Sequence, residues 1–241
     1  MDNLEITVLY DNCPYKKGLK LAWGFSCLVK GLEKTILFDV GGDGKIILEN
    51  MRSLGINPKD IDVVVLSHDH WDHTGGLNSF LTANSGVAVY MLESFSNEVK
   101  SVVKLAGADL IETKHPVKIC EHAYLTGEIR SIVNEQSLCV MTPGGQVLIA
   151  GCAHPDITLI ARFATNQFQK EFLLAMGGFH LKKSSDIEIK SVISELKGMD
   201  LKYVSPCHCT GELATTLFGE AFGDKYIESG AGRVINITDL I

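Results

Sequence analysis

The residues with the clearest chemical potential lie in one short segment, residues 67–73, which reads Ser-His-Asp-His-Trp-Asp-His. Three imidazoles and two carboxylates fall close together in it. Imidazole nitrogens combined with a carboxylate suit Zn²⁺, and also Fe, Mn or Co. The alternative is a polar loop that is rich in histidine by chance, but burying such groups without partners would be costly. The segment therefore indicates a metal site.

The spacing within this segment predicts two neighbouring ligand positions. Residues two apart in an extended chain point the same way, so His68 and His70 could bind one ion together. Asp72 and His73 would then turn into an adjacent position. The apolar run 63–66 directly precedes the segment, and a strand that ends in a polar loop is a good scaffold for a site.

Three more histidines follow apolar runs in the same way. His154 comes after residues 147–150, and His208 comes after residues 203–204. A lone histidine in such a place is more often structural, but two of them could complete the two half-sites begun at residues 68–73. His180, after residues 172–178, is open to three interpretations. It is a metal ligand, a substrate contact, or a residue that hydrogen-bonds to the ligands without binding the metal.

The seven cysteines do not indicate a disulfide framework, because their number is odd and they are scattered. Cys207 and Cys209 flank His208 and could in principle bind metal. In an extended segment they would point away from His208, which predicts that both are buried in the core. His115 and His122 receive no role, because residues 114–137 show no clear pattern. Residues 114–137 are a candidate for an insertion that faces the substrate.

The elements that must position these residues can be read from short β-branched apolar runs and from stretches with helical period. Strands are expected at residues 6–10, 25–29, 35–40, 63–66, 87–91, 138–141, 147–150, 172–176 and 203–204. Helices are expected at residues 45–54, 94–105, 157–168, 187–196 and 211–218. A strand-rich start followed by alternating strands and helices predicts an α/β (α+β) fold with two sheets face to face and helices outside. We expect residues 1–241 to form a single domain with the site between its halves.

Composition narrows the function classes. Hydrophobic residues make up 46% of the chain, which is enough for a sizeable core, and the net charge is −7 without any dense run of Lys or Arg. This balance argues against a nucleic-acid partner, because phosphate contacts need a basic face. The N-terminus lacks the pattern of a signal peptide, and no apolar run is long enough for a spanning helix. The expectation is a cytoplasmic protein without a membrane partner.

The ligand pattern resembles that of the metallo-β-lactamase superfamily. His68-x-His70-x-Asp72-His73, then His154 and His208, occur in the order usual for that superfamily. The resemblance implies a four-layer αββα sandwich with the metals at one edge between the sheets. It assigns His68, His70 and His154 to a first metal, and Asp72, His73 and His208 to a second. Asp39 matches an early aspartate that supports the metal loop without binding metal.

A narrower resemblance is to the subgroup named for 7,8-dihydropterin-6-methyl-4-(β-D-ribofuranosyl)aminobenzene-5′-phosphate synthase. It rests on the segments 151–155, 177–181 and 206–211. The chain departs from the superfamily in one respect. Most members carry a bridging aspartate in the segment that reads Gly-Gly-Phe-His at residues 177–180 here. Without it, either the second metal is bound less tightly or a hydroxide is the only bridge.

These features predict a metal-dependent hydrolase of a small ester or phosphate-bearing substrate. One or two divalent ions, Zn²⁺ with Mn²⁺ or Fe as alternatives, would lower the pKa of water, and Asp72 would ligate and orient it. A phosphate or carboxylate would lie near His180 and Thr210, although Thr210 could equally be a helix cap. The alternatives are a synthase that releases pyrophosphate from a phosphoribosyl substrate, and a di-iron redox or non-catalytic role. The acidic balance disfavours RNA processing.

Overall fold

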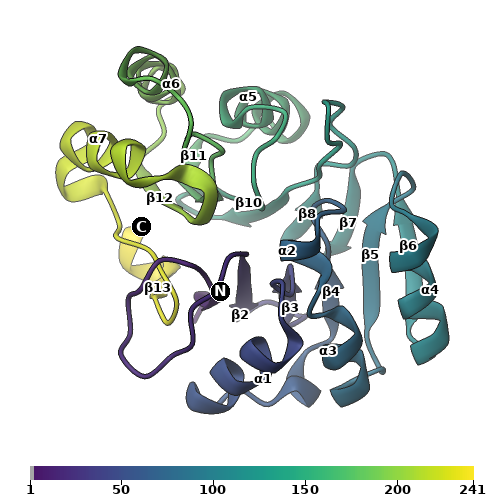
Figure 1. The fold of residues 1–241 in the computed structure, drawn as a ribbon. Coiled ribbons are helices and arrows are strands. Elements are labelled where there is room, and N and C mark those ends of the chain that lie inside the picture. Colours follow the sequence, from purple (N-terminus) through teal and green to yellow (C-terminus); the bar gives the residue numbers. More distant parts are fainter. Residues whose placement is uncertain (1–2) are drawn as a thin grey trace.

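Two β-sheets form the centre of the molecule (Figure 1). The computed structural model describes residues 3–241. The first sheet has the order β13-β1-β2-β3-β4-β5-β6, with strands β1 (Glu5–Tyr10), β2 (Ser26–Lys30), β3 (Ile36–Phe38), β4 (Val63–Val65), β5 (Ala88–Leu92), β6 (Asp109–Thr113) and β13 (Val234–Asn236). The second has the order β12-β11-β10-β9-β8-β7, with strands β7 (Val117–Cys120), β8 (Ala123–Leu125), β9 (Leu138–Thr142), β10 (Gly145–Ala150), β11 (Phe172–Gly178) and β12 (Tyr203–Cys207).

Helices cover the outer face of each sheet (Figure 1). They are α1 (Gly44–Ser53), α3 (Leu77–Ala83), α4 (Asn97–Ala106), α5 (Ile157–Phe168), α6 (Asp186–Gly198) and α7 (Glu212–Phe222). The short helix α2 (Trp71–Thr74) follows β4 and belongs to neither outer layer. One buried apolar cluster joins the facing sides of the two sheets. A second lies between the first sheet and α1, α3 and α4, and a third between the second sheet and α5, α6 and α7. The layers are therefore αββα, and the predicted fold class is confirmed.

Both sheets contain a run of parallel strands whose carboxyl ends lead into the site. In the first sheet β3, β4, β5 and β6 are parallel, and in the second β10, β11 and β12 are parallel. Functional loops of such sheets collect beyond the carboxyl ends of the strands. The loops after β3, β4, β10, β11 and β12 carry all the residues that the sequence singled out as ligands or supports.

Several short elements differ from the sequence-based expectation, among them strand β6, which was not expected. Strand β3 ends at Phe38, earlier than predicted, because Asp39 adopts a left-handed backbone with φ of 56°. Helix α3 was not expected; it is seven residues long and has no side-chain cap that could have signalled it. Residues 114–137 contain the hairpin of β7 and β8, which forms the edge of the second sheet. The short strand β13 pairs with β1.

Among residues 3–241, no helix combines the length and the apolar character that crossing a membrane requires.

Candidate metal centre

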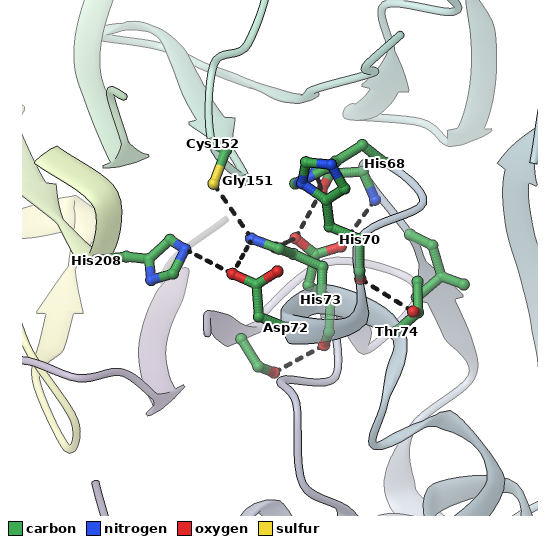
Figure 2. A network of polar contacts seen from close by, with 12 residues as sticks. His68, His70, Asp72, His73, Thr74, Gly151, Cys152 and His208 are labelled. Atoms are coloured by element: carbon green, nitrogen blue, oxygen red, sulfur yellow. Dashed lines mark hydrogen bonds and ion pairs between the residues drawn. The ribbon is translucent and has the colours of Figure 1, made fainter. Parts of the chain in front are cut away.

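Five imidazoles and one carboxylate converge at the edge between the two sheets. Figure 2 labels all of them except His154. His68 and His70 lie in the loop after β4, and Asp72 and His73 belong to the short helix α2. The second sheet contributes from the opposite side, with His154 beyond β10 and His208 directly after β12. The structure thus brings together all six residues that the sequence predicted as ligands.

The first ligand set consists of three imidazoles. The rings of His68, His70 and His154 lie with their centroids 4.7–4.8 Å apart. One ring nitrogen from each falls within 4.8 Å of the others. Three imidazoles at this spacing can face a single divalent cation, with a fourth position open to water or substrate.

The second ligand set is Asp72, His73 and His208. The Oδ2 atom of Asp72 is 3.6 Å from Nε2 of His73 and 3.4 Å from Nε2 of His208. These separations exceed the roughly 2.7–3.2 Å of a good hydrogen bond. Ligands that bind one tetrahedral Zn²⁺ at about 2.0–2.2 Å stand about 3.4 Å apart. The spacing therefore suits atoms that share a cation better than atoms that share a proton.

The far side of three imidazoles is fixed by hydrogen bonds, which aims the other nitrogen at the centre. The Nδ1 atom of His68 lies 2.8 Å from Ser67 Oγ, that of His73 lies 2.7 Å from Asp39 Oδ2, and that of His208 lies 2.8 Å from Asn12 Oδ1. The Nε2 atoms of three site histidines are buried and have no hydrogen-bond partner within residues 3–241: His68, His154 and His208. Metal-binding histidines are commonly held in this way, so the donor set fits a divalent cation.

Asp39 supports the metal loop as the resemblance implied. Its carboxylate accepts the backbone N–H of Ser67 at 2.7 Å and the hydroxyl of Ser67 at 2.7 Å, and it lies 2.7 Å from Nδ1 of His73. The side chain is completely buried and lies behind the ligands. It therefore connects the end of β4 to helix α2 and sets the direction of the His73 ring.

Glu135 has the same role for the loop after β10, and sequence reasoning missed it. Its Oε1 atom accepts the backbone N–H groups of Gly151, Cys152 and Ala153 at 2.9–3.1 Å, and Oε2 accepts that of His154 at 2.8 Å. Burial raises the pKa of Glu135, and these N–H groups oppose that rise. No periodicity marks Glu135, because its partners are distant in the sequence.

The electrostatics of the metal-free centre suit cation binding. Burial, reinforced by neighbouring imidazoles, lowers the pKa of His154 to about 3 and that of His68 well below its usual value. Burial alone would raise the pKa of Asp72, but its contact with His208 and the charge of His73 outweigh burial and lower that pKa to about 2. Neutral imidazoles such as His68 and His154 and an ionised carboxylate such as Asp72 are the forms that bind divalent metals. His73 differs, because burial lowers its pKa but the buried Asp39 carboxylate outweighs burial and raises it.

Two other predicted residues lie at or near the centre. The His180 ring is exposed, with its centroid 4.4 Å from that of His154. The Thr210 hydroxyl is fully buried, donates to the Cys207 carbonyl at 2.7 Å and accepts the Phe179 N–H at 3.1 Å. The predicted contact between Thr210 and substrate therefore does not fit its surroundings.

Cys207 is in the core between the sheets, and Cys209 is also buried, as predicted. The extended geometry on which the prediction rested, however, does not reach Cys209. Residues His208–Thr210 form a 3-10 turn, so the alternation of an extended chain stops before Cys209. The Cys209 thiol instead points to the carbonyl of Cys152 at 3.5 Å and belongs to a cluster with Cys152 and His180.

Two cavities open beside the ligands. One has a volume of about 240 Å³ and is lined by Trp23, His180, Lys182, Lys183 and Cys209. The other has a volume of about 340 Å³ and is lined by Asp69, His70, Ser94, Phe95 and residues 131–134. Residues 131–134 of the second cavity belong to the region 114–137. This position is compatible with the hypothesis that the region faces the substrate.

Comparison with known proteins shows which proteins this chain resembles. The sequence model of the metallo-beta-lactamase superfamily matches residues 24–109. The chain is 27% identical to the 7,8-dihydropterin-6-methyl-4-(beta-D-ribofuranosyl)-aminobenzene-5′-phosphate synthase of Methanocaldococcus jannaschii, over 98% of this chain and 97% of the relative. The resemblance predicted from the sequence is confirmed.

Solved structures agree. A metal-dependent hydrolase of the beta-lactamase superfamily superposes with a TM-score of 0.81 and 29% identity, over 96% of this chain and 98% of that one. A diphosphatase of the PhnP family superposes with a TM-score of 0.64 at 14% identity, over 97% of this chain and 96% of that one, which shows the fold alone. The chain has the metallo-β-lactamase fold.

The hydrogen bonds of Glu135 generate a prediction. In Glu135→Gln, an amide NH₂ would face a backbone N–H that now meets a carboxylate oxygen, leaving buried donors unsatisfied. We expect the free energy of unfolding to fall by about 2–3 kcal/mol and metal affinity to fall about 10- to 100-fold. Chemical denaturation and metal titration measure both quantities.

The matched control is Glu33→Gln, since Glu33 is exposed and accepts one backbone N–H, from Glu121, at 2.8 Å. This variant should change the unfolding free energy by no more than about 0.5 kcal/mol. Equal losses of stability in the two variants would contradict the role assigned to Glu135.

Proposed function

From the premise that this chain has the metallo-β-lactamase fold, we propose that it is a metal-dependent hydrolase with a dinuclear centre. The substrate is a small molecule with a phosphate or ester group, and Zn²⁺ is the proposed cation, with Mn²⁺ or Fe as alternatives. The observation that supports this most directly is the spacing of Asp72 Oδ2 from His73 and His208, at 3.6 and 3.4 Å. The superposition on a metal-dependent hydrolase at 29% identity supports it further.

A bound divalent cation would supply Lewis acidity, polarising a substrate oxygen and making water more acidic. His68, His70 and His154 would hold one cation, and Asp72, His73 and His208 the other. Asp72 has a second task, which is to orient the attacking water, because its ionised carboxylate lies beside both sets. The short hydrogen bonds of Asp39 and Asn12 keep the rings aligned during turnover.

The cavity beside the second set favours an anionic substrate. Lys182 and Lys183 are exposed at its rim, and the Lys182 ammonium lies 4.5 Å from the centroid of the Trp23 ring. This cation–π contact holds a positive charge near the centre. The exposed His180 ring lines the same cavity and can offer a hydrogen-bond donor. A phosphate here would be attracted by the two lysines.

A synthase reaction is the second candidate function. The 27% identity to the aminobenzene-phosphate synthase extends over nearly the whole of both chains, which supports this candidate. A condensation on a phosphoribosyl substrate with loss of pyrophosphate would use the same centre. Incubation with a phosphoribosyl donor and an aromatic acceptor, followed by a pyrophosphate assay, distinguishes the two candidates. Pyrophosphate release that requires the acceptor would favour the synthase; hydrolysis of chromogenic phosphodiesters without any acceptor would favour the hydrolase.

The ligand assignments predict that His70→Ala and Asp72→Ala each lower turnover at least about 100-fold, because a direct ligand matters more than the outer partners that cost about 10- to 100-fold. The measurement is a rate assay with a panel of chromogenic phosphodiesters and esters, alongside circular dichroism to verify folding. The matched control is His115→Ala, which removes an exposed imidazole outside the site. Full activity in a folded His70→Ala, Asp72→Ala double variant would refute the metal mechanism.

The two lysines generate a second prediction. The double variant Lys182→Ala, Lys183→Ala should raise KM for a phosphodiester about tenfold, equivalent to about 1.4 kcal/mol, because an attractive charge is lost. KM for a neutral ester and both kcat values should stay nearly constant. Lys16→Ala, Lys17→Ala removes the same charge from an exposed pair elsewhere. A similar KM change in that control, or for the neutral ester, would contradict the local role.

A further inference from the structure

Cys152 lies where it can serve both ligand sets. Its Sγ atom is 3.3 Å from Nε2 of His73 (Figure 2). His68, His73 and Cys152 each offer one ligand atom within 4.8 Å of the others. His68 belongs to the first set and His73 to the second, so this thiol faces one imidazole from each. The rings of these two histidines are themselves only 4.2 Å apart between centroids.

We propose that the Cys152 sulfur is the protein ligand that bridges the two cations, in place of the carboxylate that this chain lacks. The inference rests on the dinuclear centre of the proposed function. Zn²⁺ binds thiolate sulfur at about 2.3 Å and imidazole nitrogen at about 2.0–2.1 Å, which places the two atoms about 3.6 Å apart in a tetrahedral site. The observed 3.3 Å is close to that value. The thiol loses its proton to solvent when the cation binds.

The loop around Cys152 is built to hold this position. The backbone N–H of Cys152 donates to Glu135 at 2.9 Å, and the side chain is only 4% exposed. The preceding Gly151 must lack a side chain, because a Cβ there would approach Ser67 Oγ to 2.2 Å. The backbone of the Cys152 loop therefore packs directly against the Ser67 side chain at the strand end of the first sheet, which brings the sulfur close to His68 and His73.

The packing also explains why no carboxylate stands in the segment 177–180. A Cβ on Gly178 would lie 2.6 Å from the Cys209 sulfur, 2.4 Å from the Gly151 carbonyl and 3.2 Å from Cys152 Cα. The space that a side chain from this strand end would need is filled by the two cysteines and their loops. A side chain at Gly178 would therefore collide with the Cys209 sulfur and the Gly151–Cys152 backbone, and the Cys152 sulfur would supply the negative charge of the missing group from the neighbouring loop.

A competing use of the same sulfur is a separate soft site made by Cys152, His180 and Cys209, whose ligand atoms also lie within 4.8 Å of one another. Soft thiolate ligands would suit a Zn²⁺ ion there. The bridging site and the separate site require different residues. The bridge needs Cys152 with His68 and His73, whereas the separate site needs Cys209 equally.

The test uses Co²⁺ added stepwise to the metal-free protein. Thiolate-bound Co²⁺ gives an intense near-ultraviolet charge-transfer band, whereas imidazole and carboxylate ligands give only weak visible bands. The wild type should bind two equivalents and develop the thiolate band. In Cys152→Ser the band should disappear, and the second equivalent should bind at least about tenfold more weakly, as expected when a ligand is lost. Circular dichroism verifies that each variant folds.

Three further variants complete the test. Cys152→Asp, which restores a carboxylate at nearly the same volume, should regain the second equivalent without the band. Cys209→Ser and the distant Cys120→Ser should keep both the band and the second equivalent. The proposal is overturned if Cys152→Ser keeps the band, if it binds both equivalents with wild-type affinity, or if Cys209→Ser loses the band. Failure of the wild type to bind any Co²⁺ would instead refute the metal centre of the proposed function.

Discussion

Buried carboxylates that accept backbone N–H groups are the interaction on which the candidate centre depends. Asp39 fastens the loop after β4 in the first sheet, and Glu135 fastens the loop after β10 in the second. Each carboxylate would be costly to bury alone, and each is stabilised by the N–H groups it orders. Because the two loops meet at the edge between the sheets, ligand atoms from distant parts of the sequence lie close together there.

The backbone around the centre carries strain that these hydrogen bonds maintain. Asp39, Ala153, His180 and His208 all have a positive φ, between 51° and 55° for three of them and 56° for Asp39. Such conformations cost about 1–3 kcal/mol each outside glycine and tend to persist where function requires them. Each of these residues lies at or near the end of a strand and turns the chain sharply there. The turn directs the residue's own side chain toward the centre or, at Ala153, the side chain of the next residue, His154. Strain and hydrogen bonding together hold the ligands in position.

Much of this arrangement could be predicted from the sequence, for identifiable reasons. The ligand histidines follow apolar runs, and carboxyl ends of parallel strands converge, so local pattern was enough to group His68, His154 and His208. Glu135 and Asn12 could not be found, because their roles exist only through partners far along the chain. The burial of Cys209 was predicted, but its neighbours Cys152 and His180 were not, because a 3-10 turn begins where a strand was assumed to continue.

An anomalous diffraction map from crystals grown with zinc tests the central claim most directly. Two neighbouring zinc peaks are expected, one contacted by Nε2 atoms of His68, His70 and His154, and the other by Asp72 Oδ2 with Nε2 atoms of His73 and His208. Zinc found only at the surface, or a centre from which His154 and His208 point away, would contradict it.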